Sequence, residues 1–224
     1  VLSRIVREGD RVLVPSNYIR DILLSRFAAD PGSVCVSYVV PDIETTAGAI
    51  ASYSPLIRDI LLSGRRYIFY PSTVVETKNH LRLAQAIKLL KQSAPDMMLV
   101  LAGSNRDSQL GKELFRYVSA HELTQNIVHV GFVSEAEKTS LYQNAVAIVV
   151  PSIGESFSLP IWEAFACGCP VVASTDRDIP EQVQSAALLC DPASPEDITA
   201  KITMVWLDID GLRQRLIERG RARY

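Results

Sequence analysis

Short apolar runs alternate along this chain with segments in which apolar residues recur every three or four positions. Residues 97–102 (MMLVLA) and 146–150 (VAIVV) are typical of the runs. A strand that is apolar on both faces is buried on both, which is characteristic of a parallel sheet covered by helices on either side. The pattern therefore predicts an α/β fold with a Rossmann-like parallel sheet and helices on both faces.

The individual elements follow from the same pattern. We expect strands over residues 11–15, 33–40, 67–70, 97–102, 127–130, 146–150, 170–173 and 187–190. We expect helices over residues 17–27, 79–92, 108–121, 135–144 and 160–167, with two more closing the chain and the first ten residues ending another. Residues 43–65 are less regular, with a weak helical pattern over 56–62. The chain therefore divides into residues 1–42, a linker over 43–65 and a main domain over 66–224.

Composition excludes several classes of protein. The formal net charge is −2, so no basic excess points to a nucleic-acid partner. No apolar stretch approaches the roughly 20 residues that span a bilayer. The four cysteines form no CxxC pair and the three histidines are dispersed, which argues against a metal site. We interpret the cysteines as reduced thiols, which suits a cytoplasmic location.

Ligands of open parallel sheets bind outside the carboxyl ends of the strands, so the segments that follow the strands deserve scrutiny. They are residues 71–78, 103–104, 131–134 and 152–163. In the last of these, Pro160 fits the first turn of a helix. The backbone N–H groups of residues 157–159 should then point out of the helix start and form an anion site.

Three charged side chains accompany this anion site. Glu155 precedes it and Glu163 lies about one turn inside the helix. Two carboxylates beside a phosphate would repel it unless they face sugar hydroxyls, from which a carboxylate can accept two hydrogen bonds. Alternatively, Glu155 stabilises the helix dipole and Glu163 is solvated. Lys78 follows a strand and could meet a diphosphate across the cleft, although a lysine at a helix start is usually only solvated.

Residues 149–173, VVPSIGESFSLPIWEAFACGCPVVA, resemble a motif of glycosyltransferase family four, in which two glutamates are separated by seven residues. Glu155 and Glu163 fit that spacing. Residues 101–104 (LAGS), residues 130–134 (VGFVS) and the turn that bears Lys78 resemble further family elements in the right order. The resemblance covers residues 66–224 well and residues 11–42 more loosely.

The resemblance implies the C-terminal half of a GT-B fold that binds a nucleotide sugar, with UDP-sugar favoured on family frequency. Glu155 would contact the donor sugar and support its departure, and Glu163 would hold the ribose. Lys78 and the amides of Ser158 and Leu159 would hold the diphosphate. It names Glu155 and Lys78 as catalytic, and as nucleotide-sugar-binding Ser72, Thr73, Lys78, Gly103, Ser104, Phe132, Val133, Lys138, Glu155, Phe157, Ser158, Leu159 and Glu163.

The family transfers a hexose with retention of configuration and without a metal or other cofactor at the donor site. The acceptor would be a glycan or a lipid-linked sugar in polysaccharide biosynthesis, and the full-length protein could associate peripherally with the inner face of the membrane. Residues 1–42 would end the acceptor-binding domain. The acceptor pocket would then lie outside this chain, which by itself should bind donor without transferring sugar.

Three departures from the family pattern stand out. Ser72-Thr73 replaces a Gly-Arg pair, which removes one phosphate-binding cation. Serines 156 and 158 replace two glycines, and Ser158 could narrow the choice of donor sugar. Lys138 replaces a leucine that packs by the base. Two other functions remain open at this point: a sugar-nucleotide 2-epimerase of the same fold, and a non-catalytic nucleotide-sugar-binding module.

Overall fold

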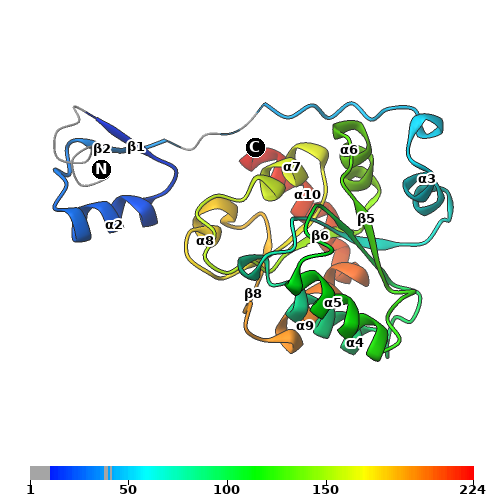
Figure 1. Ribbon diagram of the computed structural model, residues 1–224. Coiled ribbons are helices and arrows are strands. Elements are labelled where there is room, and N and C mark those ends of the chain that lie inside the picture. Colours follow the sequence, from blue (N-terminus) through cyan, green and yellow to red (C-terminus); the bar gives the residue numbers. More distant parts are fainter. Residues whose placement is uncertain (1–10, 38–39, 41) are drawn as a thin grey trace.

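The computed structural model describes residues 11–224 except 38, 39 and 41 (Figure 1). The main body is built on a parallel sheet in the order β5-β4-β3-β6-β7-β8. Every one of these strands is found within two residues of its expected position. They are β3 (Tyr67–Pro71), β4 (Met98–Ala102), β5 (Ile127–Gly131), β6 (Ala147–Val150), β7 (Val171–Ser174) and β8 (Leu188–Cys190). The predicted parallel sheet is confirmed.

Helices cover the sheet on both faces (Figure 1). One face carries α4 (His80–Leu90), α5 (Gln109–Ala120) and α9 (Pro195–Trp206), which pack against one another. The other carries α6 (Glu135–Asn144), α7 (Leu159–Cys167) and α10 (Leu212–Arg223). Strands β3, β4, β6 and β7 lie between these layers and are almost entirely buried, as their apolar sequences require.

Local chemistry sets the helix boundaries near the expected positions. The Ser134 hydroxyl accepts from the Glu137 amide at the start of α6, and the Glu137 carboxylate accepts from the Ser134 amide, which forms a capping box. Pro160 lies in the first turn of α7. Gly168 ends that helix in a left-handed conformation with φ of +68°, which an amino acid with a side chain rarely adopts.

An N-terminal unit precedes the main body. It consists of β1 (Val12–Val14), α2 (Asn17–Phe27) and β2 (Val34–Val36), and its two strands are parallel. It has a small core of its own, formed by Val14, Leu23, Ala29 and Val34. The helix expected at the first ten residues lies outside the described residues.

The segment expected to be a linker contains the anticipated weak helix, α3 (Pro55–Leu62). Two of its side chains, Ile57 and Ile60, are buried in the core of the main body, and the helix packs against α6. This part of the segment is therefore held by tertiary contacts. Among the described residues, no helix is long and apolar enough to cross a membrane.

One helix was not expected from the sequence. It is α8 (Ile179–Val183), which follows β7 and has only five residues. A helix of five residues is too short to show a repeat of apolar residues. Pro180 in its first turn is the main residue that favours a helix start there.

The strand order positions the functional site. The chain runs outward from β3 to β4 and β5, and then returns to place β6 on the other side of β3. The direction of the strand order therefore reverses between β3 and β6. In open α/β sheets this is where a crevice forms at the carboxyl ends of the strands.

Candidate functional site

Lys78 and Glu155 follow the two strands at the reversal point. Lys78 ends a short 3₁₀ turn, Glu76–Lys78, after β3. The buried Tyr70 hydroxyl donates to the Lys78 carbonyl oxygen at 3.0 Å, and the Asn79 side chain donates to the Pro151 carbonyl oxygen at 3.0 Å. The Tyr70 bond fastens the turn to β3, and the Asn79 bond fastens it to the loop between β6 and α7, residues 151–158, called here the β6–α7 loop.

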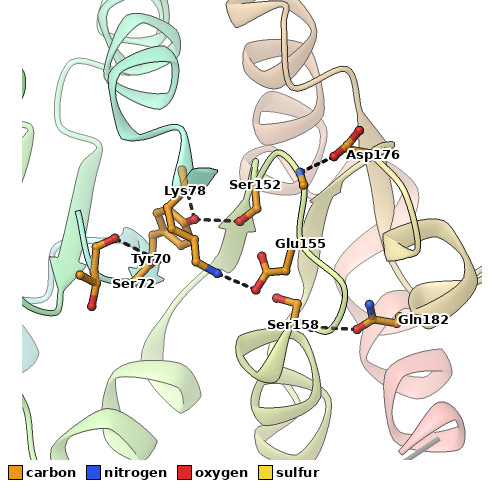
Figure 2. Close-up of polar contacts among 10 residues, drawn as sticks. Tyr70, Ser72, Lys78, Ser152, Glu155, Ser158, Asp176 and Gln182 are labelled. Carbon is orange, nitrogen blue, oxygen red and sulfur yellow. Dashed lines mark hydrogen bonds and ion pairs between the residues drawn. The ribbon is translucent and has the colours of Figure 1, made fainter. Parts of the chain in front are cut away.

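The Lys78 ammonium donates to the Glu155 carboxylate across this crevice, with 2.6 Å between Nζ and Oε1 (Figure 2). The exposed fractions of the two side chains are 25% and 10%, so neither is simply solvated. The other carboxylate oxygen, Oε2 of Glu155, is buried and has no hydrogen-bond partner among the described residues. A buried carboxylate oxygen left without a donor is costly, and a ligand hydroxyl would satisfy it.

Glu163 is held by two side chains of α6. Lys138 Nζ donates to its Oε1 at 2.7 Å, and the Tyr142 hydroxyl donates to its Oε2 at 2.5 Å. The Glu163 side chain is only 16% exposed, so the interpretation of a solvated glutamate is wrong. A carboxylate has about four acceptor positions, and these two bonds leave room for further donors such as a vicinal diol.

The electrostatics of this cluster favour a charged Lys138 and a neutral Tyr142. Burial by itself would lower the pKa of Lys138, but hydrogen bonds to Glu163 and Glu135 outweigh burial and raise it. Burial, followed by the charge of Glu163, raises the pKa of Tyr142 well above its usual range. Tyr142 therefore remains a hydrogen-bond donor to the glutamate at neutral pH.

A cavity of about 220 Å³ lies beside this cluster, at the ends of β3, β4 and β5. Gly103 has φ of +145°, and a Cβ there would lie 2.6 Å from the Ser72 carbonyl oxygen, so only glycine allows the strand ends to approach this closely. The Phe132 side chain is 90% exposed at the cavity. The cavity brings together seven of the predicted site residues, namely Ser72, Thr73, Gly103, Ser104, Phe132, Val133 and Lys138.

The start of α7 differs from the expectation of open amides. The Ser158 amide donates to Gln182 Oε1 at 3.0 Å, so it already has an acceptor within the protein (Figure 2). The Ser158 hydroxyl is buried without a partner among the described residues. Leu159 is about half exposed at the helix start. Phe157 stacks on Trp162 with ring centroids 6.1 Å apart, which gives it a packing role.

Sequence reasoning missed several residues that hold this site. Tyr142 follows Lys138 by four positions on α6, so helical spacing could have placed the two on one face. Glu135 pairs with Lys138 at 2.9 Å and lines the cavity. Asp176 and Gln182 also contact the β6–α7 loop. They follow β7, and no sequence pattern near them indicates that they meet a loop that follows β6.

Two other cavities are larger but lack this chemistry. One of about 690 Å³ lies at the amino ends of β3 and β4, where Arg66 stacks on Trp206. One of about 450 Å³ lies beside His80, whose pKa burial lowers to about 4. Neither contains a pair of buried carboxylates beside a helix start. In the part of the chain that the structure describes, no three His, Cys, Asp or Glu side chains gather as metal ligands.

Comparison with known proteins places the chain in a family. The model of the family described as glycosyl transferases group 1 matches residues 56–223. The O-antigen chain mannosyltransferase B of Escherichia coli is 29% identical over 215 residues, which cover 94% of this chain and 55% of that protein. The chain thus spans about half the length of the curated relatives it matches.

Solved structures agree. The C-terminal domain of the group 1 family protein LpcC from Francisella tularensis is 26% identical with a TM-score of 0.66, and the match covers 81% of this chain and 96% of that one. Anabaena HepE, solved in complex with UDP and glucose, is 19% identical with a TM-score of 0.78, and the match covers 96% of this chain and 57% of that one. The fold is therefore that of the C-terminal half of a GT-B glycosyltransferase, and the chain belongs to the glycosyl transferases group 1 family.

Proposed function

We propose that this chain is the donor-binding part of a retaining hexosyltransferase that uses a nucleoside diphosphate sugar, with UDP-sugar favoured. The observation that carries the proposal is the pairing of Lys78 with Glu155 at the reversal point of the sheet, beside the partly buried Glu163. A cation, two carboxylates and a helix start at one sheet edge match the phosphate, the hydroxyls and the ribose of such a donor.

Each part of the donor has a proposed position. The diphosphate takes the Lys78 ammonium and the Leu159 amide at the start of α7, since the Ser158 amide already donates to Gln182. The ribose diol takes the remaining acceptor positions of Glu163. The base lies in the 220 Å³ cavity against Phe132, whose exposed ring offers a stacking surface. The sugar hydroxyls reach Oε2 of Glu155, the buried oxygen that has no donor in the described part of the chain.

Catalysis would depend on Glu155 and Lys78. As the bond between sugar and phosphate breaks, positive charge develops on the sugar and negative charge on the departing diphosphate. The Glu155 carboxylate stabilises the positive charge on the sugar, and the Lys78 ammonium stabilises the negative charge on the diphosphate. The proposal includes retention of configuration and no requirement for a metal at the donor site.

The acceptor and the biological context belong to the whole protein. The name of the Escherichia coli relative refers to an O-antigen chain, and we propose a glycan or a lipid-linked sugar as acceptor in polysaccharide biosynthesis. The proposed location is the cytoplasm, with peripheral association at the inner face of the membrane. The choice of uridine draws support from the UDP bound by the structural neighbour HepE.

Isothermal titration calorimetry tests the proposal. UDP, GDP and ADP are titrated into the chain in EDTA and then in magnesium. We expect UDP to bind most tightly and the affinity to be the same in both buffers. Strict magnesium dependence would refute the metal-free site, and absence of binding by all three nucleotides would refute the donor-binding function. Release of an epimerised sugar from a nucleotide sugar alone would indicate a 2-epimerase.

A further inference from the structure

The β6–α7 loop, which carries Glu155, is held at both ends by one short segment of the chain. The segment comprises residues 176–183 and is called here the α8 segment. The Gly154 amide donates to Asp176 Oδ2, and the Ser158 amide donates to Gln182 Oε1 at 3.0 Å. In Figure 2 both contacts lie on the side of the loop opposite Lys78. The loop is therefore held between two groups of contacts: the α8 segment binds its backbone on one side, and Lys78 binds the Glu155 side chain on the other.

These contacts constrain where Glu155 points. Gln182 and Ser158 are both fully buried, so water does not compete for their hydrogen bond. Gly154 has φ of +78°, a conformation that glycine adopts without strain and that lets the chain turn between the two contacts. Glu155 lies between the two anchored amides, so its direction depends on both.

The opposite side of the α8 segment contacts the N-terminal unit. The Ser16 hydroxyl donates to Asp178 Oδ2 at 2.6 Å, and both residues are fully buried. The Glu181 carboxylate accepts from the Asn17 amide at 3.0 Å and from the Asn17 side chain at 2.6 Å. Ser16 is also the N-cap of α2, because its Oγ accepts from the Ile19 amide at 3.2 Å. One short segment thus joins the first turn of α2 to the loop that carries Glu155.

We propose that Asp178 and Gln182 are positioning residues, through which the N-terminal unit sets the conformation of the β6–α7 loop and so of Glu155. Ser16 fixes Asp178, and Asp178 fixes the start of the α8 segment. Gln182, one turn later, fixes the Ser158 amide. When the N-terminal unit moves away, the α8 segment loses the contacts at Asp178 and Glu181, so it holds the loop less firmly and Glu155 is no longer fixed toward Lys78. The coupling itself does not require donor binding. Its importance for catalysis rests on the proposed function.

Hydrogen exchange measured by mass spectrometry tests this coupling without any nucleotide. Asp178→Ala removes the acceptor of Ser16, while Asp178→Asn retains an oxygen that can accept from it. Asp178 makes no capping bond to α8, so neither change removes a cap. We expect amide exchange over residues 151–160 to rise about tenfold in Asp178→Ala. In Asp178→Asn it should stay close to that of the parent chain.

A double-mutant cycle and a matched control sharpen the test. Ser16→Ala should raise loop exchange as Asp178→Ala does, and the double variant should add little, because both remove one interaction. Ser108→Ala removes the N-cap serine of α5, whose Oγ accepts from the Gly111 amide at 3.1 Å, and should leave the loop unchanged. Gln182→Met should raise loop exchange without affecting residues 11–36.

Two outcomes would overturn the proposal. In the first, Asp178→Ala raises exchange only over residues 11–36, which would make the contact a simple anchor for the N-terminal unit. In the second, β3 and β4 exchange faster together with the loop, which would indicate general loss of structure. Neither outcome depends on whether the chain binds a nucleotide, so a failure here is distinct from a failure of the donor-binding function.

Discussion

Lys78 and Glu155 are 77 positions apart in the chain, yet Lys78 Nζ lies 2.6 Å from Glu155 Oε1. In the absence of donor, the cation proposed for the diphosphate and the carboxylate proposed for the sugar neutralise each other. Under the proposed function, a bound diphosphate would compete with Glu155 for the same ammonium. The ion pair gives each of the two charges a counter-ion within the protein.

The first prediction concerns Lys78. Lys78→Met should weaken UDP binding by about 1.5–3 kcal/mol, as expected for loss of a charge-assisted hydrogen bond to phosphate. Uridine, which lacks phosphates, should bind the variant as it binds the parent chain. Calorimetry with both ligands checks this. An equal loss for UDP and uridine would show that Lys78 supports the fold or the base cavity instead.

The second prediction concerns Glu155. Glu155→Gln removes the competitor for the Lys78 ammonium, so UDP should bind the chain up to about threefold more tightly, the size expected for a partly exposed ion pair. In the full-length protein the same change should lower kcat by a factor of about 10²–10³, because the lost carboxylate acts on charge that develops only in the transition state. Weaker UDP binding to Glu155→Gln would contradict the competition.

The third prediction separates Glu163 from Glu155. Glu163→Gln should weaken UDP and uridine alike and mainly raise the donor KM, since a ribose hydrogen bond is similar in the ground and transition states. Tyr142→Phe should produce a smaller loss of the same kind, because it removes one of the two donors that orient the carboxylate. 2′-Deoxyuridine diphosphate serves as the control. It lacks the 2′-hydroxyl, so its affinities for the parent chain and for Glu163→Gln should be similar.

The fourth prediction concerns Glu137 and pH. Burial by itself would raise the pKa of this carboxyl, but hydrogen bonds from the Ser54 and Ser134 amides and the Ser134 hydroxyl outweigh burial and lower it to about 2. The unfolded chain therefore binds a proton at higher pH than the folded chain. The stability that Glu137 contributes is present above its ordinary pKa of 4.5 and is lost as pH falls toward 2.

Glu137→Gln tests this assignment. The substitution should lower the free energy of unfolding at pH 7 by about 1–3 kcal/mol, because it weakens the joint between α3 and α6. The difference between the two proteins should shrink as pH falls below 4.5, as urea unfolding at several pH values would show. Glu113→Gln, on the surface of α5, provides a control whose stability should follow that of the parent chain. A difference that grows toward low pH would reverse the assigned sign.

The sequence by itself determined the elements and much of the site. Apolar runs and helical periods depend on near neighbours in the chain, so β3 to β8 and α4 to α7 were predictable within a few residues. The motif that contains Glu155 and Glu163 lies on one loop and one helix, and its spacing alone predicts that both carboxylates accompany the start of α7. The parallel sheet followed from strands that are apolar on both faces.

Only the tertiary structure decided which groups these residues meet. The partners of Glu155, Glu163 and Ser158 come from other elements: Lys78 from the turn after β3, Tyr142 from α6 and Gln182 from α8. The contact between Ser16 and Asp178 spans 162 positions. Strand order determines the contact between Lys78 and Glu155, because β6 lies beside β3 and the carboxyl ends of both strands meet at one crevice. Strand order is a property of the whole packed sheet, and no local pattern of residues specifies it.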